Sequence, residues 1–316
     1  MSTTGIIIGV AGCSSETDTT SGWRRVESPT EKTLYSVVQS TKGPYAVGEG
    51  GKVLAERRDG WVVVVKHGPT GEGNTLRGTA VSDDGRHVWF AGGSGVLGVY
   101  DVVNRQMTDY SAPKEKTSTW EDIAVTGSAG GEHIYLINGS GELLQGENDG
   151  GKVNWGTVIK PGGGSSMKGI AFVDEGIGYI CDTNAKVYET LNGGDKWSTI
   201  GIEGGSVGLY DVAPVSPDRI NVAGGSGSVF RYNGFTWTRL KLGENTINAI
   251  DRTKDGGLAA GGGGSIYRLT DNWQVEPTPT TNTLHGIIVG TEDFSETAIG
   301  GSGTILQRSR NDGFLS

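Results

Sequence analysis

The residue types that usually carry out catalysis do not occur in this sequence at the spacing that a catalytic mechanism requires. The four histidines form no His-x-His or His-Glu-x-x-His pair, so a zinc or non-haem iron site has little support. They are His67, His87, His133 and His285. The sequence therefore predicts no catalytic residue, no metal site and no cofactor, and favours a non-enzymatic protein.

Glycine-rich segments are the next candidates, because a glycine loop can cradle a phosphate. Such a cradle needs a helix N-terminus directly after the loop, ideally with Lys-Ser or Lys-Thr. Here each segment precedes a strand-like run, which favours a turn. Seven of these segments occur, each four residues long and here called a tetrad; they begin at Gly48, Gly92, Asn138, Asp182, Gly224, Gly261 and Gly300.

The spacing of the tetrads predicts a β-propeller. Successive tetrads start 37 to 46 residues apart, and a period near 40 is typical of four-stranded blades. Each repeat reads as four strands, a to d in chain order, with the tetrad as the b–c turn. We therefore expect an all-β, seven-bladed propeller with four antiparallel strands per blade. The fourth tetrad, residues 182–185, lacks glycine, and we expect Asn184 to be its left-handed residue.

The last repeat lacks a strand d of its own. Residues 22–27 have the character of the missing strand, and an open sheet edge is a liability. We expect this N-terminal strand to complete the seventh blade. Residues 22–316 are thus predicted to form a single propeller domain.

The c–d turns carry a second recurring element, a polar or glycine cluster shortly before an aromatic residue. Asx side chains bond to backbone amides in such turns, and an indole can fill the space between blades. In the fourth repeat, residues 190–197 resemble the Asp-box of BNR repeats. The turn residues to which we assign this structural role are Asp59, Trp61, Asn192, Gly194, Trp197, Asn233, Trp237, Asp271 and Trp273.

In repeat form the chain resembles the WD40/YVTN/BNR-like propeller superfamily, most closely the Ycf48-like photosystem II stability and assembly factor group. The resemblance implies a binding or assembly role, since photosynthetic members are similar to chaperones that use a basic patch on one face. No matching arginine cluster is visible, because Arg57 and Arg58 share one turn and the other arginines are dispersed. Sialidases also carry Asp-boxes, but their Arg-Ile-Pro element is absent here and they have six blades.

The favoured hypothesis is a binding or scaffold protein that presents one face to a protein or glycan partner. Propellers usually bind on the face formed by the b–c and d–a turns. The candidate contacts are Glu49, Lys66, His67, Asn138, Asn184 and, as an exposed loop tryptophan, Trp120. For Trp120 a core role is an equal alternative. The competing class is a glycan-active hydrolase or lyase, sialidase-like, with acids from separate blades. The formal net charge of −9 argues against nucleic-acid binding.

The N-terminal segment suggests a membrane anchor. Residues 10–13, Val-Ala-Gly-Cys, resemble a lipobox, in which Cys13 would be lipidated after removal of an apolar leader, residues 1–12. Residues 13–21 then read as a flexible tether. The segment is similar to the latter half of a twin-arginine lipoprotein signal of halophilic archaea. We therefore expect an extracytoplasmic, lipid-anchored protein; the alternative is a cytoplasmic protein with an accidentally apolar N-terminus.

Overall fold

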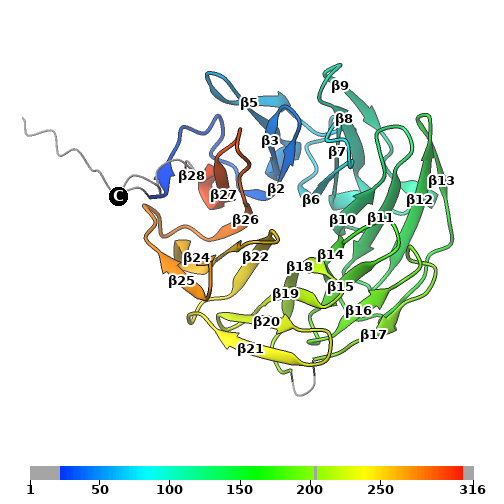
Figure 1. Ribbon diagram of the computed structural model, residues 1–316. Helices are drawn as coiled ribbons and strands as arrows, with labels where there is room; N and C mark the ends of the chain where they lie inside the picture. Colours follow the sequence, from blue (N-terminus) through cyan, green and yellow to red (C-terminus); the bar gives the residue numbers. More distant parts are fainter. Residues whose placement is uncertain (1–21, 203–204, 309–316) are drawn as a thin grey trace, which may run out of the picture.

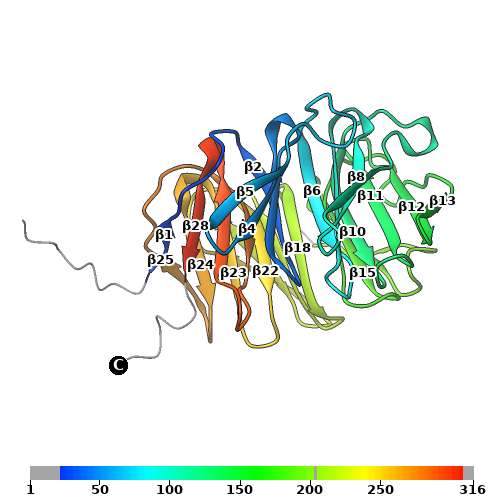
Figure 2. The ribbon, with the colours of Figure 1, turned by 90° about the horizontal axis from the view of Figure 1, so that it is seen from above.

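Seven four-stranded antiparallel sheets surround a central axis (Figure 1). The computed structural model describes residues 22–202 and 205–308. Seen from the side, the ring forms a flattened disc (Figure 2). The predicted all-β class, seven blades and four antiparallel strands per blade are confirmed.

The blades follow one another in chain order, and each inner strand lies next to the axis (Figure 1). Blades 1 to 3 are β2 (Leu34–Ser40), β3 (Gly43–Gly48), β4 (Val53–Arg57), β5 (Gly60–Val65); β6 (Leu76–Val81), β7 (His87–Gly92), β8 (Leu97–Asp101), β9 (Gln106–Asp109); β10 (Trp120–Thr126), β11 (His133–Asn138), β12 (Leu143–Asp149), β13 (Lys152–Trp155). Blades 4 and 5 are β14 (Met167–Phe172), β15 (Gly178–Asp182), β16 (Val187–Thr190), β17 (Ser198–Thr199); β18 (Leu209–Ser216), β19 (Arg219–Gly224), β20 (Ser228–Tyr232), β21 (Trp237–Lys241). Blades 6 and 7 are β22 (Ile247–Arg252), β23 (Gly257–Gly261), β24 (Ile266–Leu269), β25 (Trp273–Glu276); β26 (Leu284–Ile288), β27 (Glu296–Gly300), β28 (Ile305–Arg308), with β1 (Arg24–Arg25) outermost.

The N-terminal strand closes the ring as predicted. In the antiparallel pair of β1 and β28, Arg24 lies opposite Gln307 and Arg25 opposite Leu306. The pairing covers the outer edge of β28, which would otherwise be open to another chain.

The apolar core is divided among the blade junctions. Seven buried clusters occur, each made of side chains from two neighbouring blades. At the junction of blades 2 and 3, for example, Trp89 and Trp120 are both fully buried. Burial of apolar area is the main stabilising term, so each blade depends on its two neighbours.

The fourth residue of every tetrad is left-handed, with φ between 60° and 73°. Glycine is needed at most of these positions because a side chain would strike the d–a connection. A Cβ on Gly303, for example, would lie 1.8 Å from the carbonyl oxygen of Thr30.

In the fourth tetrad the left-handed residue is Ala185, with φ 60°, so the expectation for Asn184 is wrong. The side chain of Asp182 explains the difference, because its Oδ1 accepts hydrogen bonds from the backbone N–H groups of Asn184 and Lys186, both 2.9 Å long. These bonds hold Asn184 out of the left-handed region. The Ala185 Cβ has room because Gly205 lies opposite it: a Cβ added at Gly205 would lie only 2.8 Å from the Cβ of Ala185.

Each inner strand has a β-bulge directly after its first residue. In β2, for example, the register shifts between Leu34 and Ser36, and the same shift recurs in the other six. A bulge inserts one unpaired residue and re-aims its side chain. Because the inner strands line the axis, these bulges determine which side chains lie at the channel mouth.

Candidate functional site

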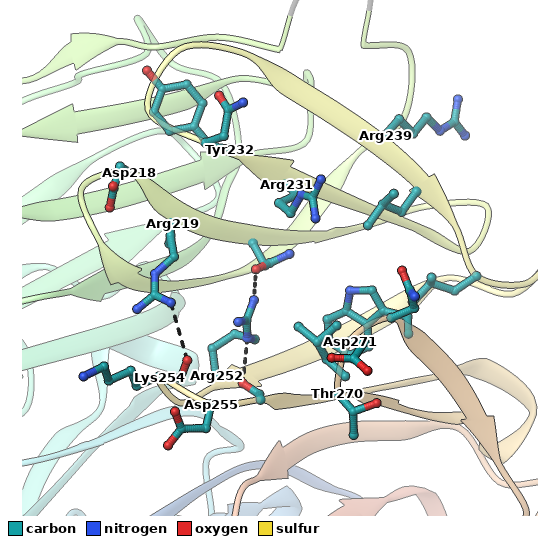
Figure 3. A pocket seen from close by; sticks show the side chains of 18 of the residues that line it. Asp218, Arg219, Arg231, Tyr232, Arg239, Arg252, Lys254, Asp255, Thr270 and Asp271 are labelled. Carbon is teal, nitrogen blue, oxygen red and sulfur yellow. Dashed lines mark hydrogen bonds between the residues drawn. The ribbon is translucent and has the colours of Figure 1, made fainter.

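A cleft lies between blades 5 and 6, and its lining includes residues of the a–b and c–d turns. Figure 3 shows the side chains that line it. The cleft has a volume of about 740 Å³, within the range of small-molecule and peptide side-chain sites. The a–b and c–d turns lie on the face opposite the one that the sequence favoured. The cleft gathers six basic and three acidic side chains: Arg219, Arg231, Arg239, Lys241, Arg252 and Lys254, with Asp218, Asp255 and Asp271.

The cleft is basic although the whole chain carries a formal charge of −9. Its arginines come from different strands: Arg219 begins β19, Arg231 lies in β20, Arg239 in β21 and Arg252 ends β22. The arginines are dispersed in the sequence, but the fold brings four of them into one cleft. The repeat pattern could have indicated this arginine cluster, because strand c of one blade and strand a of the next lie at the same junction.

Neutral oxygens, not carboxylates, hold Arg219 and Arg252 of the cleft in place (Figure 3). Nε of Arg252 donates to the Gly256 carbonyl at 2.8 Å, and its Nη1 donates to Oδ1 of Asn221. Nη1 of Arg219 donates to the Lys254 carbonyl at 3.5 Å. Within residues 22–202 and 205–308, none of the four arginines forms an ion pair.

The crowding of like charges is visible in the titration of Arg252. Burial lowers the pKa of its guanidinium, and the nearby charge of Arg219 lowers it further; Asp251 opposes this in part, and Arg231 adds a smaller lowering. An anion in the cleft would relieve this repulsion. The electrostatics therefore favour a negatively charged ligand.

A buried donor adds to this cationic surface. Asn221 lines the cleft and is only 1% exposed, with its Oδ1 turned toward Arg252. Its Nδ2 has no hydrogen-bond partner among the described residues. Leaving a buried donor unpaired costs about 1–3 kcal/mol. A ligand oxygen that accepts from Asn221 would remove that cost.

An exposed aromatic side chain lies beside the cleft. Phe235 is 91% exposed at the c–d turn of blade 5. Asn233 holds this turn, since its Oδ1 accepts from the N–H groups of Phe235 at 3.1 Å and Thr236 at 2.8 Å. A neighbouring pocket of about 540 Å³ is lined by Phe235 and shares Tyr232 and Arg239 with the cleft. Exposed aromatic residues next to arginine are typical of binding surfaces.

The Asp-box-like turn of the fourth repeat forms the expected bonds. Oδ1 of Asn192 accepts from the N–H of Lys196 at 3.0 Å, and Oγ1 of Thr190 accepts from the N–H of Gly194 at 2.9 Å. The ring of Trp197 packs edge-on against Phe172, with centroids 6.3 Å apart. This turn is therefore a structural element.

Of the other predicted turn residues, the tryptophans make packing or hydrogen-bond contacts within the described part of the chain, whereas Asp59 and Asp271 do not. Trp61 and Trp273 pack at the blade 7–1 and 5–6 junctions, and Nε1 of Trp237 donates to the Ile200 carbonyl at 2.9 Å. Asp59 and Asp271 are exposed, and the described residues offer their side chains no hydrogen bond. The Asx-type bond is thus missing from these two turns.

The predicted contacts on the b–c face separate into two groups. Lys66, His67 and Asn184 are exposed, and Glu49 is half-buried with its carboxylate accepting from the N–H of Thr33 at 3.1 Å. These four stay accessible.

Asn138 and Trp120 are not available to a partner. Asn138 is 1% exposed and acts as a turn cap, with Nδ2 donating to Glu142 at 2.9 Å. Trp120 is fully buried in β10, so the expectation of an exposed tryptophan is wrong and the core alternative is correct. The bulge that follows directs Glu121 toward the channel and leaves the indole between the blades.

Cys13 and the predicted leader and tether, residues 1–21, lie outside the described residues. Cys181, in β15, is fully buried as a free thiol. In the part of the chain that the structure describes, no helix is long and apolar enough to cross a membrane. The same part contains no group of three or more His, Cys, Asp or Glu side chains suited to a metal ion.

No protein-family model matches the chain, and no curated protein matches it. Solved structures match it in shape. The WD40 repeats of RRP9 superpose with a TM-score of 0.76 at 8% identity, covering 92% of this chain and 98% of that one. YCF48 bound to a D1 peptide gives a TM-score of 0.71 at 15% identity, covering 90% and 94%.

A catalytically inactive virginiamycin B lyase from Staphylococcus aureus, solved with quinupristin, gives a TM-score of 0.74 at 16% identity, covering 90% and 98%. At such identities the likeness concerns the fold. The structural neighbours of this chain are thus WD40 and YCF48-like seven-bladed propellers, together with a propeller lyase.

Proposed function

We propose that the protein is a non-enzymatic binding or scaffold protein that takes an acidic segment of a protein partner into the cleft between blades 5 and 6. The observation that carries this proposal is the set of four arginines that have no carboxylate partner among the described residues. Bidentate pairing between a guanidinium and a carboxylate would satisfy them. YCF48, a propeller of similar fold, is bound to a peptide, which supports a comparable role for this chain.

A polypeptide suits this surface better than a small anion. The cleft holds about 740 Å³ and continues toward the exposed Phe235, so charged and apolar contacts lie side by side. An acidic segment with an adjacent apolar residue would use both. A Ycf48-like assembly role is the finer form of this proposal.

The test uses a fluorescently labelled peptide of alternating Asp, Glu and Leu, with a Lys-rich peptide of equal length as comparison. We expect saturable binding of the acidic peptide only, weakening as the salt concentration rises. Arg231→Glu should weaken binding at least about 10-fold, since 1.4 kcal/mol corresponds to one decade. Arg58→Glu is the matched control, because Arg58 is exposed on the same face in blade 1. Equal binding of both peptides, or equal loss in both variants, would overturn the proposal.

An enzyme is the second candidate function, and two carboxyl groups favour it. Asp122 and Asp211, from blades 3 and 5, both line a cavity on the axis. Burial raises the pKa of Asp122 to about 7, and it raises the pKa of Asp211 as well. A carboxylic acid that is neutral near pH 7 can serve as a general acid in glycan cleavage. Chromogenic glycosides and sialosides test this: turnover that Asp122→Asn abolishes would support it, and no turnover would count against it.

We also propose that Cys13 anchors the protein outside the cytoplasm. The support is the lipobox-like sequence of residues 10–13, with polar residues after it. Intact mass spectrometry of the protein from its native membranes tests this. A chain beginning at Cys13 with added lipid mass is expected, whereas an unprocessed chain in the soluble fraction would contradict the proposal.

A further inference from the structure

The seven bulged residues of the inner strands meet in one cavity around the axis. Each blade contributes one, and all seven line a volume of about 220 Å³. The set is Tyr35, Arg77, Glu121, Lys168, Tyr210, Asn248 and His285, here called the channel ring. It opens on the face of the b–c turns, because Leu34 pairs with Gly48 at the start of the first tetrad. The channel ring is thus separate from the basic cleft on the opposite face.

Packing fixes the residues on either side of each ring position. The residue before it is always large, apolar and fully buried, as Leu34 and Leu76 are. The residue after it is small or an aspartate, because the inner strands lie close together: a Cβ on Gly78 would lie 2.7 Å from Oδ1 of Asp122. Only the bulged position is free to vary, and all seven of its side chains carry a polar group. This pattern is typical of a recognition surface on a repeated scaffold.

Contacts inside the ring hold several of these side chains in place. Nζ of Lys168 lies 2.8 Å from Oε2 of Glu121, which neutralises both charges. The Tyr35 ring lies against the His285 ring, with centroids 5.2 Å apart. The guanidinium of Arg77 lies 5.7 Å from the centre of the Tyr35 ring. Such mutual support lowers the entropy lost when a ligand binds.

Arg77 is the unneutralised cation of the ring. It is exposed, and the described residues place no carboxylate within ion-pair distance of it. A guanidinium in this state pairs best with a carboxylate, which accepts two parallel hydrogen bonds. One part of the ligand should therefore be a carboxylate.

The other ring positions suit hydroxyl groups. Nδ2 of Asn248 donates to the Leu284 carbonyl at 2.9 Å, so its Oδ1 can accept from a ligand. Burial lowers the pKa of His285, whose neutral imidazole offers one donor and one acceptor. Tyr210 adds a phenol. The carboxyl groups near the ring are already engaged: Glu121 pairs with Lys168, Glu49 accepts from the Tyr35 hydroxyl, and Asp122 and Asp211 accept from backbone N–H groups. An ammonium group would have to compete with these bonds.

From this geometry we propose that the channel ring binds a carboxylated monosaccharide, with its carboxylate on Arg77 and its hydroxyls on Asn248, His285 and Tyr210. The volume of about 220 Å³ holds about seven waters at roughly 30 Å³ each, which is the scale of one sugar ring. The aromatic ring of Tyr210 can cover its C–H surface, whereas the Tyr35 ring already packs against His285 and Arg77. This site is independent of the proposed peptide cleft and lies in the same cavity as Asp122 and Asp211.

Calorimetric titration of the full chain with D-glucuronate and N-acetylneuraminate tests the proposal, with D-glucose and acetate as comparisons. At least one sugar acid should bind saturably and at least about 10-fold more tightly than glucose or acetate. Arg77→Gln should remove that preference while leaving peptide binding by the cleft unchanged. Arg86→Gln is the matched control, since Arg86 is exposed at the a–b turn of the same blade. Thermal unfolding of each variant checks that the fold is retained.

Any of the next three results overturns the proposal, as does an unchanged preference for sugar acids in Arg77→Gln. If neither sugar acid binds saturably, the ring is not such a site. If glucose binds as tightly as the acids, Arg77 does not select a carboxylate. If acetate does so, the hydroxyl contacts contribute nothing. Loss of peptide binding alone would contradict the proposed function and leave the ring untouched.

Discussion

Nε1 of Trp23 donates a hydrogen bond of 2.6 Å to Oε2 of Glu276, and so ties the closing strand to blade 6 as well as to blade 7. The carboxylate of Glu276 also lies 2.5 Å from Nε of Arg268 and 2.6 Å from Nη1 of Arg308. Burial opposes ionisation here, but the hydrogen bonds from Arg268 and Trp23 and the charges of Arg268 and Arg308 together outweigh it and lower the pKa of Glu276. Ring closure therefore depends on a charged network in addition to strand pairing.

Trp23→Phe is expected to destabilise the protein by about 1–2 kcal/mol, because it removes a donor from a charged acceptor. Trp61→Phe is the matched control, since both indoles are 6% exposed but Nε1 of Trp61 has no partner among the described residues. Urea denaturation of both variants gives the comparison. Equal losses would mean that the Glu276 bond contributes nothing.

Stability should depend on pH through His87 and Glu132, whose Nδ1 and Oε1 lie 2.5 Å apart. The hydrogen bond to Glu132 raises the pKa of His87. The stabilisation that His87 provides is therefore fully present below about pH 6.5 and is lost as pH rises through its pKa in the folded protein. Burial opposes ionisation of Glu132, but bonds from His87 and Trp89 lower its pKa to about 2. Its contribution is complete above about 4.5 and is lost as pH falls toward 2.

The contribution of this pair to the free energy of unfolding should thus be highest between about pH 4.5 and 6.5 and fall on both sides. His87→Gln should flatten the fall above pH 6.5 relative to the exposed control His67→Gln. Burial also raises the pKa values of Asp122, Asp211 and Asp251, so the total free energy of unfolding falls as pH rises from about 4, but both variants share this loss. Denaturation from pH 4 to 9 measures the difference. Parallel profiles for the two variants would contradict this assignment.

The repeat pattern predicts much of the fold because tetrads and turns are local. The left-handed position at the end of Gly48–Gly51 and the bonds of Asn192 depend on residues within one turn. The basic cleft depends instead on how two blades meet, and Arg231 and Arg252 share no local motif. The burial of Trp120 likewise depends on a bulge that only strand pairing reveals.

The first tetrad allows backbone strain to be separated from steric contact. Gly50 and Gly51 are both left-handed, with φ 71° and 67°. A Cβ on Gly50 meets only the end of the Lys52 side chain, 4.0 Å away, whereas one on Gly51 would lie 2.5 Å from backbone atoms of His67 and Gly68. Gly50→Ala should therefore cost only about 1–2 kcal/mol, the strain of the left-handed conformation. Gly51→Ala should cost clearly more, and equal midpoints in urea would show that the d–a connection yields freely.

Phe235 should contribute to binding and not to folding. Its side chain is 91% exposed, so Phe235→Ser should change the free energy of unfolding by no more than about 0.5 kcal/mol. If the acidic segment in the cleft also places an apolar residue on this ring, the same variant should weaken binding of the Asp-Glu-Leu peptide about 5- to 10-fold. Leu191→Ser, at a 64% exposed position in the c–d turn of blade 4, is the control. Fluorescence titration compares peptide binding by the two variants. An equal loss in both would mean that Phe235 makes no specific contact with the peptide. No loss in either would mean that the peptide contacts the arginines and not Phe235.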